Sequence, residues 1–305
     1  MTNENIRKSI SILGGSGGMG RVFSTFFKNH GFSVTIHDQN PKKMEKVARE
    51  IGVNFDTSLE RSVKNADIIL VSVPISTTID VIKSISPYLK KDALICDITS
   101  IKHDVCQLYE EILKEKPINC LSLHPMFGPG IKNMRNYIMI VIKVGGTVIY
   151  NDLVSDIVRL FKSVGLKIIE TTPDVHDKKI ASTLGLPHMI NILFLNLLKR
   201  TGDPLNELTR FTGTTFLLQK VFAESIIQRE MEMFGEIQME NSKFLEILNN
   251  LELLIKDYKA IIENKDKIKF CELFTQALEY SRNDIHFANS YEYFYKFMKI
   301  LKKKE

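Results

Sequence analysis

The chain has 305 residues, of which 44% are hydrophobic and 25% are charged, so it is long enough for one large domain or two medium ones with proper cores. This composition excludes an intrinsically disordered protein and a small disulfide scaffold. Lys and Arg outnumber Asp and Glu by 41 to 36, and this net charge of +5 is spread along the chain, which favours small anionic ligands over a nucleic-acid surface.

The cysteines and the apolar runs indicate a cytoplasmic protein. The four cysteines form no C-x-x-C pair and no metal-like cluster, which predicts reduced thiols and no metal site. The apolar run at residues 10–13 is too short for the core of a signal peptide. The longest apolar stretch, residues 184–198, is interrupted by a histidine and two asparagines and is shorter than a membrane span. We therefore expect a soluble protein without a membrane segment.

Up to about residue 172, short β-branched runs alternate with helical patterns. This alternation predicts an α/β domain of Rossmann type with a parallel sheet. The near-continuous apolar character of the runs suits strands that are buried on both faces. The expected strands are residues 10–13, 33–36, 68–73, 93–97, 120–123, 137–144 and 167–170.

Three of the intervening helices have recognisable ends. The first begins near Gly18 and stops at Gly31, which is a good residue just past a helix. The second has Asn40 in the capping position and Pro41 at its first helical position. The third covers about residues 153–164 and ends at Gly165.

After Pro173 the strand signals fade and long helical periodicities continue to the end of the chain. We therefore expect a Rossmann-type domain over residues 1–172 and an all-α domain over residues 173–305. Apolar residues from Phe244 to Tyr258 recur at spacings of three and four, as in an amphipathic helix. Such a stripe is usually buried within its domain or against a second subunit.

A glycine-rich turn follows the first expected strand and precedes the first expected helix. It contains G-x-G-x-x-G at Gly15, Gly17 and Gly20. Gly15 permits the tight turn, Gly17 lets the backbone approach a pyrophosphate, and Gly20 lets the helix pack closely on the strand. Because the N-terminus of the helix offers free N–H groups and a positive dipole end, we expect the whole turn to bind a dinucleotide. Its other members are Ser16, Gly18 and Met19.

Asp38 ends the second expected strand at about the distance that a ribose-binding acid requires. Its carboxylate can accept hydrogen bonds from the ribose hydroxyls and would repel a 2′-phosphate, which favours NAD over NADP. Lys42 and Lys43 follow closely and could reach a phosphate, so NADP stays possible. Val73 and Pro74 end another strand at the same sheet edge, where we expect them to form a wall of the cofactor site.

The remaining motifs resemble those of one enzyme family. Five segments agree in order and spacing with the prephenate dehydrogenase family, whose members are also called TyrA or cyclohexadienyl dehydrogenases. They are GGSGGMG, VSVPIS, DITSIK, HPMFGPG and HDKKIASTLGLPH. The resemblance implies a Rossmann-type domain, a helical domain that forms a homodimer, and an active site between them. It also implies oxidation of prephenate with NAD(P), release of carbon dioxide and formation of 4-hydroxyphenylpyruvate, in tyrosine biosynthesis.

The resemblance assigns roles to individual residues. His124 matches the catalytic histidine that accepts a hydrogen bond or proton from the ring hydroxyl of the substrate, and Ser100 matches the serine that supports it. His176 and His188 match histidines near the substrate. Arg210 matches an arginine that holds a carboxylate in some branches, for which its planar fork is suited. Asp97 and Lys102 are interpreted as strand-end and helix-start residues without a site role.

Three positions depart from the family pattern, and several alternatives stay open. Leu217 stands where other branches of the family place the arginine, Gly185 where many members have histidine, and Gly130 where an acidic residue is common. The substrate could be arogenate instead of prephenate. A β-hydroxyacid dehydrogenase is the weaker alternative, because the lysine motif of that group is not found after Pro173. A catalytically silent dinucleotide-binding regulator is the alternative from a different class. Feedback inhibition by tyrosine and the role of residues 241–305 are left open.

Overall fold

The computed structural model describes residues 8–228 and 231–302. The contacts divide the chain into two compact units, and the chain passes from one to the other between Ile180 and Ala181. The first unit therefore extends beyond the change of pattern at Pro173 and includes helix α7, Pro173–Ile180. The functional domain ranges expected from the sequence stay a prediction.

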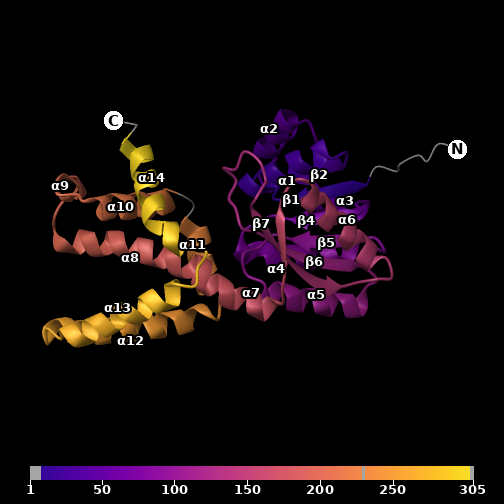
Figure 1. Ribbon diagram of the computed structural model, residues 1–305. Coiled ribbons are helices and arrows are strands. Elements are labelled where there is room, and N and C mark those ends of the chain that lie inside the picture. The colour runs from indigo at the N-terminus through magenta and orange to yellow at the C-terminus, as the bar shows by residue number, and fades with distance from the viewer. Residues whose placement is uncertain (1–7, 229–230, 303–305) are drawn as a thin grey trace. The chain divides into compact units, whose positions relative to one another are not determined.

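The first unit is built on one sheet (Figure 1). Among the described residues it has eight strands in the order β3-β2-β1-β4-β5-β6-β7-β8. They are β1 (Ser9–Leu13), β2 (Ser33–His37), β3 (Asn54–Phe55), β4 (Ile68–Val71), β5 (Leu94–Asp97), β6 (Asn119–Pro125), β7 (Ile138–Gly145) and β8 (Lys167–Glu170). All seven expected strands are present. The two residues of β3 are exposed, so this strand leaves no apolar run in the sequence.

The expectation of a parallel sheet is wrong for one pair of strands. β6 and β7 pair in antiparallel fashion, whereas every other described pair is parallel. The reason lies in the connection, residues 126–137, which contains no helix. A parallel return needs a crossover of a dozen or more residues, usually a helix, while an antiparallel return does not.

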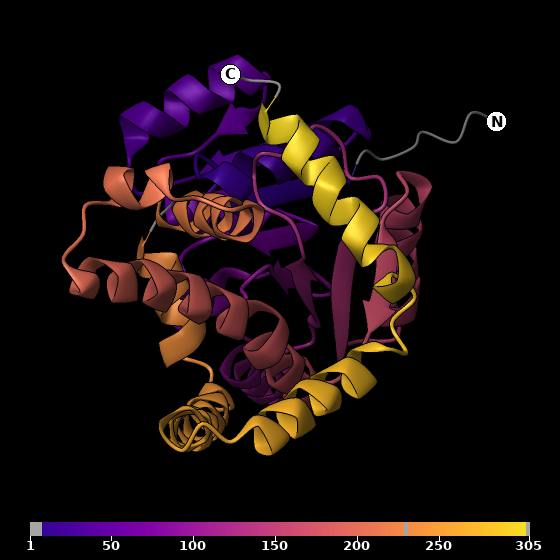
Figure 2. The ribbon, with the colours of Figure 1, turned by 60° about the vertical axis from the view of Figure 1, so that its left-hand side comes forward.

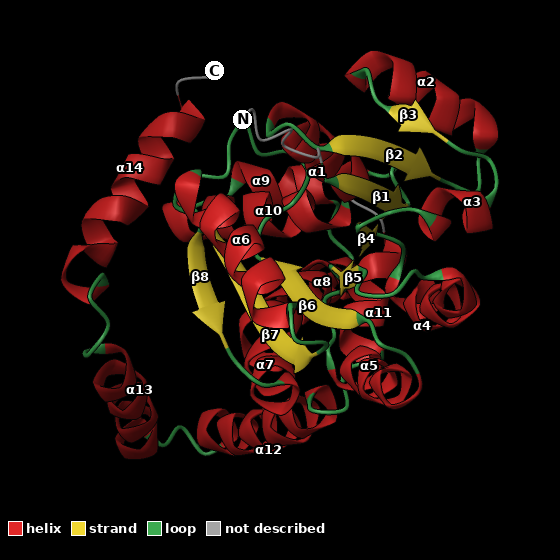
Figure 3. Cartoon of the chain, turned by 90° about the vertical axis from the view of Figure 1, so that its right-hand side faces the viewer, coloured by secondary structure: helices red, strands yellow, loops and turns green. Residues whose placement is uncertain are grey.

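Helices cover both faces of the sheet. One face is packed by α1 (Gly18–Asn29), α2 (Pro41–Ile51) and α6 (Tyr150–Ser163). The other face is packed by α3 (Leu59–Lys64), α4 (Ile75–Ile85) and α5 (His103–Glu115). Figure 3 shows α4 and α5 together along one side of the sheet. The fully buried strands β4 and β5 follow from these two layers.

The expected helix ends are confirmed. Gly31 follows α1 with φ +86°, a conformation that glycine adopts without strain. The side chain of Asn40 accepts a hydrogen bond from the backbone N–H of Lys43, and Pro41 is the first residue of α2. The helix expected over residues 153–164 begins earlier, at Tyr150, and Gly165 follows it with φ +87°.

The second unit consists of helices and turns over its described residues. They are a π-helix (Ala181–Gly185), α8 (Leu186–Thr201), α9 (Leu205–Arg210), α10 (Thr214–Ile227), α11 (Met231–Met239), α12 (Phe244–Glu263), α13 (Lys267–Ser281), a 3-10 helix (Phe287–Asn289) and α14 (Ser290–Lys302). Figure 2 shows α12, α13 and α14 in orange to yellow, with a short turn between α12 and α13 and the 3-10 helix before α14. The helix expected from Phe244 is α12, but its apolar stripe is only partly covered, since Leu254 and Ile255 are exposed.

One helical stretch of the described residues, Pro173–Thr201, is long and apolar enough to cross a membrane by length and composition alone. This is weak evidence, because helices of soluble proteins pass the same test. The stretch begins with α7, whose His176 and Asp177 side chains are buried in hydrogen bonds within the first unit.

Candidate active site

The glycine-rich turn is held by close backbone contacts that exclude side chains. A Cβ atom on Gly20 would lie 2.2 Å from the carbonyl oxygen of Gly14, and one on Gly15 would lie 2.5 Å from Cβ of Ile36. Gly14, which the motif does not include, has φ +76°, and its Cβ would lie 2.2 Å from the carbonyl oxygen of Ser72. Three glycines are therefore required by the fold of the turn itself.

The turn leaves the N-terminus of α1 available to a ligand. Gly17 is the N-cap, no side chain caps the helix, and its first turn carries no acidic residue. The first N–H groups of a helix have no partner within the helix, and they favour anions. A Cβ on Gly17 would meet only the carbonyl oxygen of Gly14, at 3.2 Å, so the open side of the turn is free for the approach of a phosphate.

Asp38 lies directly against this turn. Its Oδ2 accepts hydrogen bonds from the hydroxyl of Ser16 at 2.5 Å and from the Ser16 backbone N–H at 3.2 Å. The carboxylate therefore stands beside the turn, where it can accept from hydroxyl donors. The side chain of Val73 also lies beside the turn, since its Cγ1 would be 3.2 Å from a Cβ on Gly14. The next residue, Pro74, is the N-cap of α4.

The turn and the HPMFGPG segment meet in space. A Cβ on Gly18 would lie 2.9 Å from Cγ of Pro129, which joins the start of α1 to the loop after β6. A groove of about 700 Å³ borders this junction and is lined by residues of α1, by His30, Pro129 and Val164, and by residues 131–134. β1, β4, β5 and β6 run parallel, so the segments after these strands all lie at one edge of the sheet, the usual ligand edge of such folds.

His124 stands near the end of β6 and is only 4% exposed. Its Nδ1 lies 2.9 Å from Nε2 of His176. Nδ1 of His176 in turn lies 2.7 Å from Oδ1 of Asp177. The expected catalytic residue is thus the end of a line of three buried side chains, of which the other two belong to α7.

The same cluster contains a buried ion pair that the sequence interpretation missed. The ammonium of Lys102, which is fully buried, donates to Oδ2 of Asp97 at 2.5 Å and to the carbonyl oxygen of Leu123 at 2.6 Å. Leu123 directly precedes His124, so Lys102 holds the backbone of the strand end. The only signal in the sequence is the DITSIK segment, which does not reveal that its lysine is buried.

The surroundings keep both histidines neutral. Burial lowers the pKa of His124 well below its ordinary value, and the neighbouring His176 and Lys102 lower it further. Burial also lowers the pKa of His176, against the opposing effect of the Asp177 carboxylate. A charged imidazole would be costly here because it would be desolvated beside the Lys102 ammonium. His124 can therefore act as an acceptor at neutral pH.

Ser100 lies in the loop between β5 and α5 and is half-buried. This loop belongs to the same sheet edge as His124. The contact of Ser100 with His124 that the family resemblance implies stays a prediction.

His188 and Arg210 belong to the second unit. His188 is in α8, its ring lies edge-on to Phe234 at 4.5 Å, and burial lowers its pKa. Its Nδ1 is buried without a hydrogen-bond partner. Arg210 ends α9, is exposed, and forms an ion pair with Glu207 at 3.2 Å. The structure thus gives the predicted residues in two sets, with His124 and His176 in the first unit and these two in the second.

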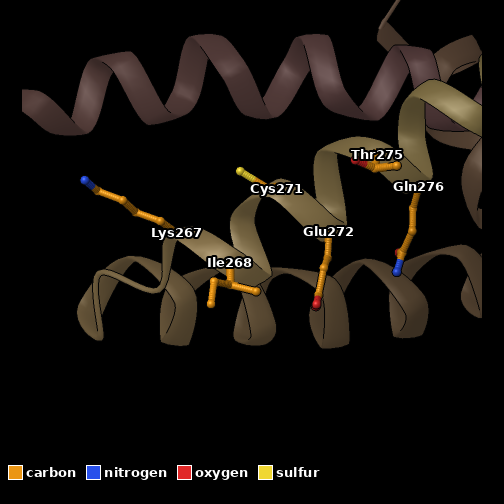
Figure 4. Close-up of a pocket in the computed structure, with 6 residues that line it drawn as sticks. All are labelled: Lys267, Ile268, Cys271, Glu272, Thr275 and Gln276. Atoms are coloured by element: carbon orange, nitrogen blue, oxygen red, sulfur yellow. The ribbon is translucent and has the colours of Figure 1, made fainter.

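The second unit also has a groove along α13 (Figure 4). Its volume is about 600 Å³. It is lined by Lys267, Ile268, Cys271, Glu272, Thr275 and Gln276. The groove contains none of the predicted site residues. Among the described residues, no group of three or more His, Cys, Asp and Glu side chains is arranged to hold a metal ion.

Comparison with known proteins gives matches in both units. Residues 23–142 match the family model described as "Prephenate dehydrogenase, nucleotide-binding domain", and residues 172–276 match "Prephenate dehydrogenase, dimerization domain". A "Probable arogenate/prephenate dehydrogenase" of Methanocaldococcus jannaschii is 30% identical over 283 residues, which are 92% of this chain and 62% of that protein. A "T-protein" of Haemophilus influenzae is 25% identical over 91% of this chain and 68% of its own length. The chain thus spans about two thirds of the length of these relatives.

Solved structures agree in fold. The prephenate dehydrogenase of Aquifex aeolicus, in complex with hydroxyphenyl propionate and NAD+, has a TM-score of 0.74 at 20% identity, over 92% of this chain and 100% of that chain. The arogenate dehydrogenase of Synechocystis has a TM-score of 0.68 at 16% identity, over 89% and 98%. With both family models matched in order and a relative 30% identical over 92% of its length, this chain belongs to the prephenate dehydrogenase family.

Proposed function

We propose that the chain is an NAD-dependent oxidoreductase that converts prephenate to 4-hydroxyphenylpyruvate and carbon dioxide in tyrosine biosynthesis. The observation that carries this proposal is the neutral imidazole of His124, buried at the sheet edge that also holds the glycine-rich turn. This oxidation requires two groups at one edge of the sheet. One is NAD+, which accepts the hydride, and the other is His124, which accepts a hydrogen bond from the substrate hydroxyl.

Three features of the chain fit NAD. The uncapped N-terminus of α1 suits a pyrophosphate. The Asp38 carboxylate beside Ser16 suits the ribose hydroxyls and disfavours a 2′-phosphate. Glycines at positions 15 and 20 keep the turn close to its own strand and helix. When bound, NAD+ supplies the nicotinamide ring that takes up a hydride.

The reaction asks little covalent chemistry of the protein. A hydride leaves the ring carbon that bears the hydroxyl, taking both electrons of its bond. The bond between the ring and its carboxylate breaks, carbon dioxide departs, and the remaining electron pair completes the aromatic ring. The hydroxyl proton stays on the phenol product. Neutral His124 accepts a hydrogen bond from this hydroxyl and stabilises the positive charge that grows as the hydride leaves, and Ser100 supports it.

The substrate also needs partners for its two carboxylates. We assign one of them to Arg210, whose guanidinium is exposed and engaged only in a surface ion pair with Glu207 among the described contacts, and we place His188 near the substrate. For His176 the contacts favour a supporting role, because its two ring nitrogens lie against His124 and Asp177.

The assembly and the location complete the proposal. Exposed apolar side chains on α12 and α13, such as Leu253 and Phe274, support a homodimer through the C-terminal helices. The family model that matches residues 172–276 is described as a dimerization domain. Three of the four cysteines are buried and form no disulfide. Free thiols are usual in the cytoplasm, where disulfides are rare, and this supports a cytoplasmic enzyme.

Arogenate is the alternative substrate, supported by the names of the Methanocaldococcus and Synechocystis proteins. It differs from prephenate by an amine in place of the side-chain keto group. The test is to measure the rate for each of the four pairs of substrate and cofactor, prephenate or arogenate with NAD or NADP. The absorbance of NADH or NADPH gives the rate, and the fastest pair identifies the preferred substrate and cofactor. No turnover of either substrate by the purified chain would contradict the proposal and favour a dinucleotide-binding regulator.

The role of His124 has its own test. We expect His124→Asn to lower kcat by about 10²-fold or more while NAD affinity changes little, because the acceptor for the hydroxyl is lost and the turn is untouched. Titration calorimetry measures the affinity of both proteins. A variant with wild-type kcat would place the acceptor elsewhere.

A further inference from the structure

His176 has both ring nitrogens engaged in the interior of the first unit. The residue is 1% exposed. Its Nδ1 lies 2.7 Å from Oδ1 of Asp177, and its Nε2 lies 2.9 Å from Nδ1 of His124. The second ring nitrogen of His124, Nε2, takes no part in this line. The positions of two protons therefore decide what His124 offers to a substrate.

The Asp177 carboxylate fixes the first of these protons. At the start of α5, the backbone N–H of Lys102 donates a hydrogen bond to Oδ1 of Asp177 at 2.9 Å. The backbone N–H of His103 donates to Oδ2, also at 2.9 Å. An ionised carboxylate can only accept, so Nδ1 of His176 must be the donor in the contact with Oδ1. Because burial keeps His176 neutral, its Nε2 then carries a lone pair and no proton.

The second proton follows from the first. Two ring nitrogens at 2.9 Å form a hydrogen bond only if one of them carries a proton. Since Nε2 of His176 is the acceptor, Nδ1 of His124 is the donor. His124 is neutral as well, so its single proton is on Nδ1 and its Nε2 is unprotonated.

We propose that Asp177, acting through His176, fixes the tautomer of His124 and so keeps Nε2 of His124 an acceptor for the ring hydroxyl of the substrate. The inference rests on the proposed function for the identity of that hydroxyl, but the tautomer itself does not. Asp177 and His176 are positioning residues in this scheme, since neither touches the reacting atoms. The reverse tautomer would point an N–H at the hydroxyl and would lose the acceptor.

Burial is the main reason why both rings of the line are neutral. The Lys102 ammonium at the start of α5 lowers the pKa of both histidines further, whereas the carboxylates of Asp177 and of Asp97, which is paired with that ammonium, raise the pKa of His176 without offsetting its burial. Asp177 of α7 is the anion in direct contact with a histidine of the line. The Asp177 carboxylate thus determines which nitrogen of His176 carries the proton, and His176 determines the same for His124, while both rings stay neutral.

The tautomer can be read directly in the wild-type protein. In ¹⁵N-histidine-labelled full-length chain at pH 8, two-bond couplings from the ring carbon protons distinguish an Nδ1–H ring from an Nε2–H ring. The signals of His124 are assigned by their loss in His124→Asn. We expect His124 and His176 both to be Nδ1–H. An Nε2–H ring at His124 would overturn the inference, whatever the enzyme activity.

Two variants of matched length test the consequence for catalysis. In His176→Gln the amide can donate its N–H to Asp177 and present its oxygen to Nδ1 of His124, so the tautomer and most of kcat should be retained. In His176→Met the link is gone, His124 is expected to become Nε2–H, and kcat should fall by roughly 10²-fold. The KM values and NAD affinity should change little in both.

The outcomes separate the inference from the proposed function. Equal kcat values in the two folded variants, or an unchanged His124 tautomer in His176→Met, would overturn the inference while leaving the activity in place. Absence of turnover by the wild type would overturn the proposed function, and the labelled wild type would still decide the tautomer. Far-UV circular dichroism confirms that each variant is folded.

Discussion

The buried ion pair between Lys102 and Asp97 makes a strong prediction for stability. Lys102→Met keeps the length of the side chain and removes the ammonium. Oδ2 of Asp97 would then keep only the backbone N–H of Thr99, at 3.0 Å, and its Oδ1 is already buried without a partner. The carbonyl oxygen of Leu123 would lose its donor as well.

The expected magnitude follows from the burial of both partners. Both side chains are fully buried, and removal of one partner from a buried pair costs about 3–5 kcal/mol because a desolvated charge is left behind. For a unit of this size that corresponds to a fall in Tm of about 6–20 °C. The double variant Asp97→Asn, Lys102→Met removes both charges, so it should be clearly more stable than the single variant.

The assay must report on the first unit. The sequence contains no tryptophan, so thermal and urea unfolding are followed by far-UV circular dichroism. Hydrogen exchange of peptides from α5 and β6 identifies which transition belongs to this unit. A single variant within about 1 kcal/mol of the wild type, or a double variant less stable than the single one, would refute the reasoning.

Four further predictions concern the glycine-rich turn with Asp38 and the histidines His124 and His176. Gly20→Ala should abolish tight NAD binding in calorimetry, because its Cβ would lie 2.2 Å from the carbonyl oxygen of Gly14 and backbone atoms cannot yield; wild-type affinity would contradict this. Asp38→Ala should lower the preference for NAD over NADP by about 10-fold in kcat/KM, since an acceptor and a repelling charge are both lost; an unchanged ratio would move the selectivity elsewhere. With decreasing pH, kcat/KM should stay constant through pH 6.5 and fall only below it, because the pKa of His124 is lowered and the protonated ring cannot accept; a fall centred at or above 6.5 would contradict this. Stability should be lost over the same range, since the unfolded chain binds protons on His124 and His176 from about pH 6.5 downward while the native state does not.

Local patterns in the sequence were sufficient for much of the fold. Short, near-continuous runs of β-branched and other apolar residues predicted seven strands, and glycine or proline at the helix ends predicted where α1 stops and where α2 starts. The antiparallel pairing of β7 was missed because the strand itself looks the same in either direction. Only the connection of residues 126–137 distinguishes the two, by its lack of a helix.

The local geometry of a candidate site can be predicted from the sequence where a motif fixes it. The glycine-rich turn and the neighbouring Asp38 are of this kind, while their binding of NAD stays a prediction. The environment of His124 is not, because it depends on the packing of α7 and of the start of α5 against β6. A lysine at the start of a helix is usually solvated, so the complete burial of Lys102 follows only from tertiary structure. The same holds for His176, whose neighbours along the sequence give no sign of a contact with His124.

The attachment of α7 to the sheet unit has a consequence for how the protein can be taken apart. A fragment cut at residue 172 would retain the whole sheet and the glycine-rich turn, yet it would lack Asp177, which accepts hydrogen bonds from the backbone N–H groups at the start of α5. The fragment would also lack His176, so Nδ1 of His124 would lose its neighbour in the interior of the unit. A cut after Ile180 avoids both defects, so any transplant of this module onto another scaffold should carry those eight residues with it.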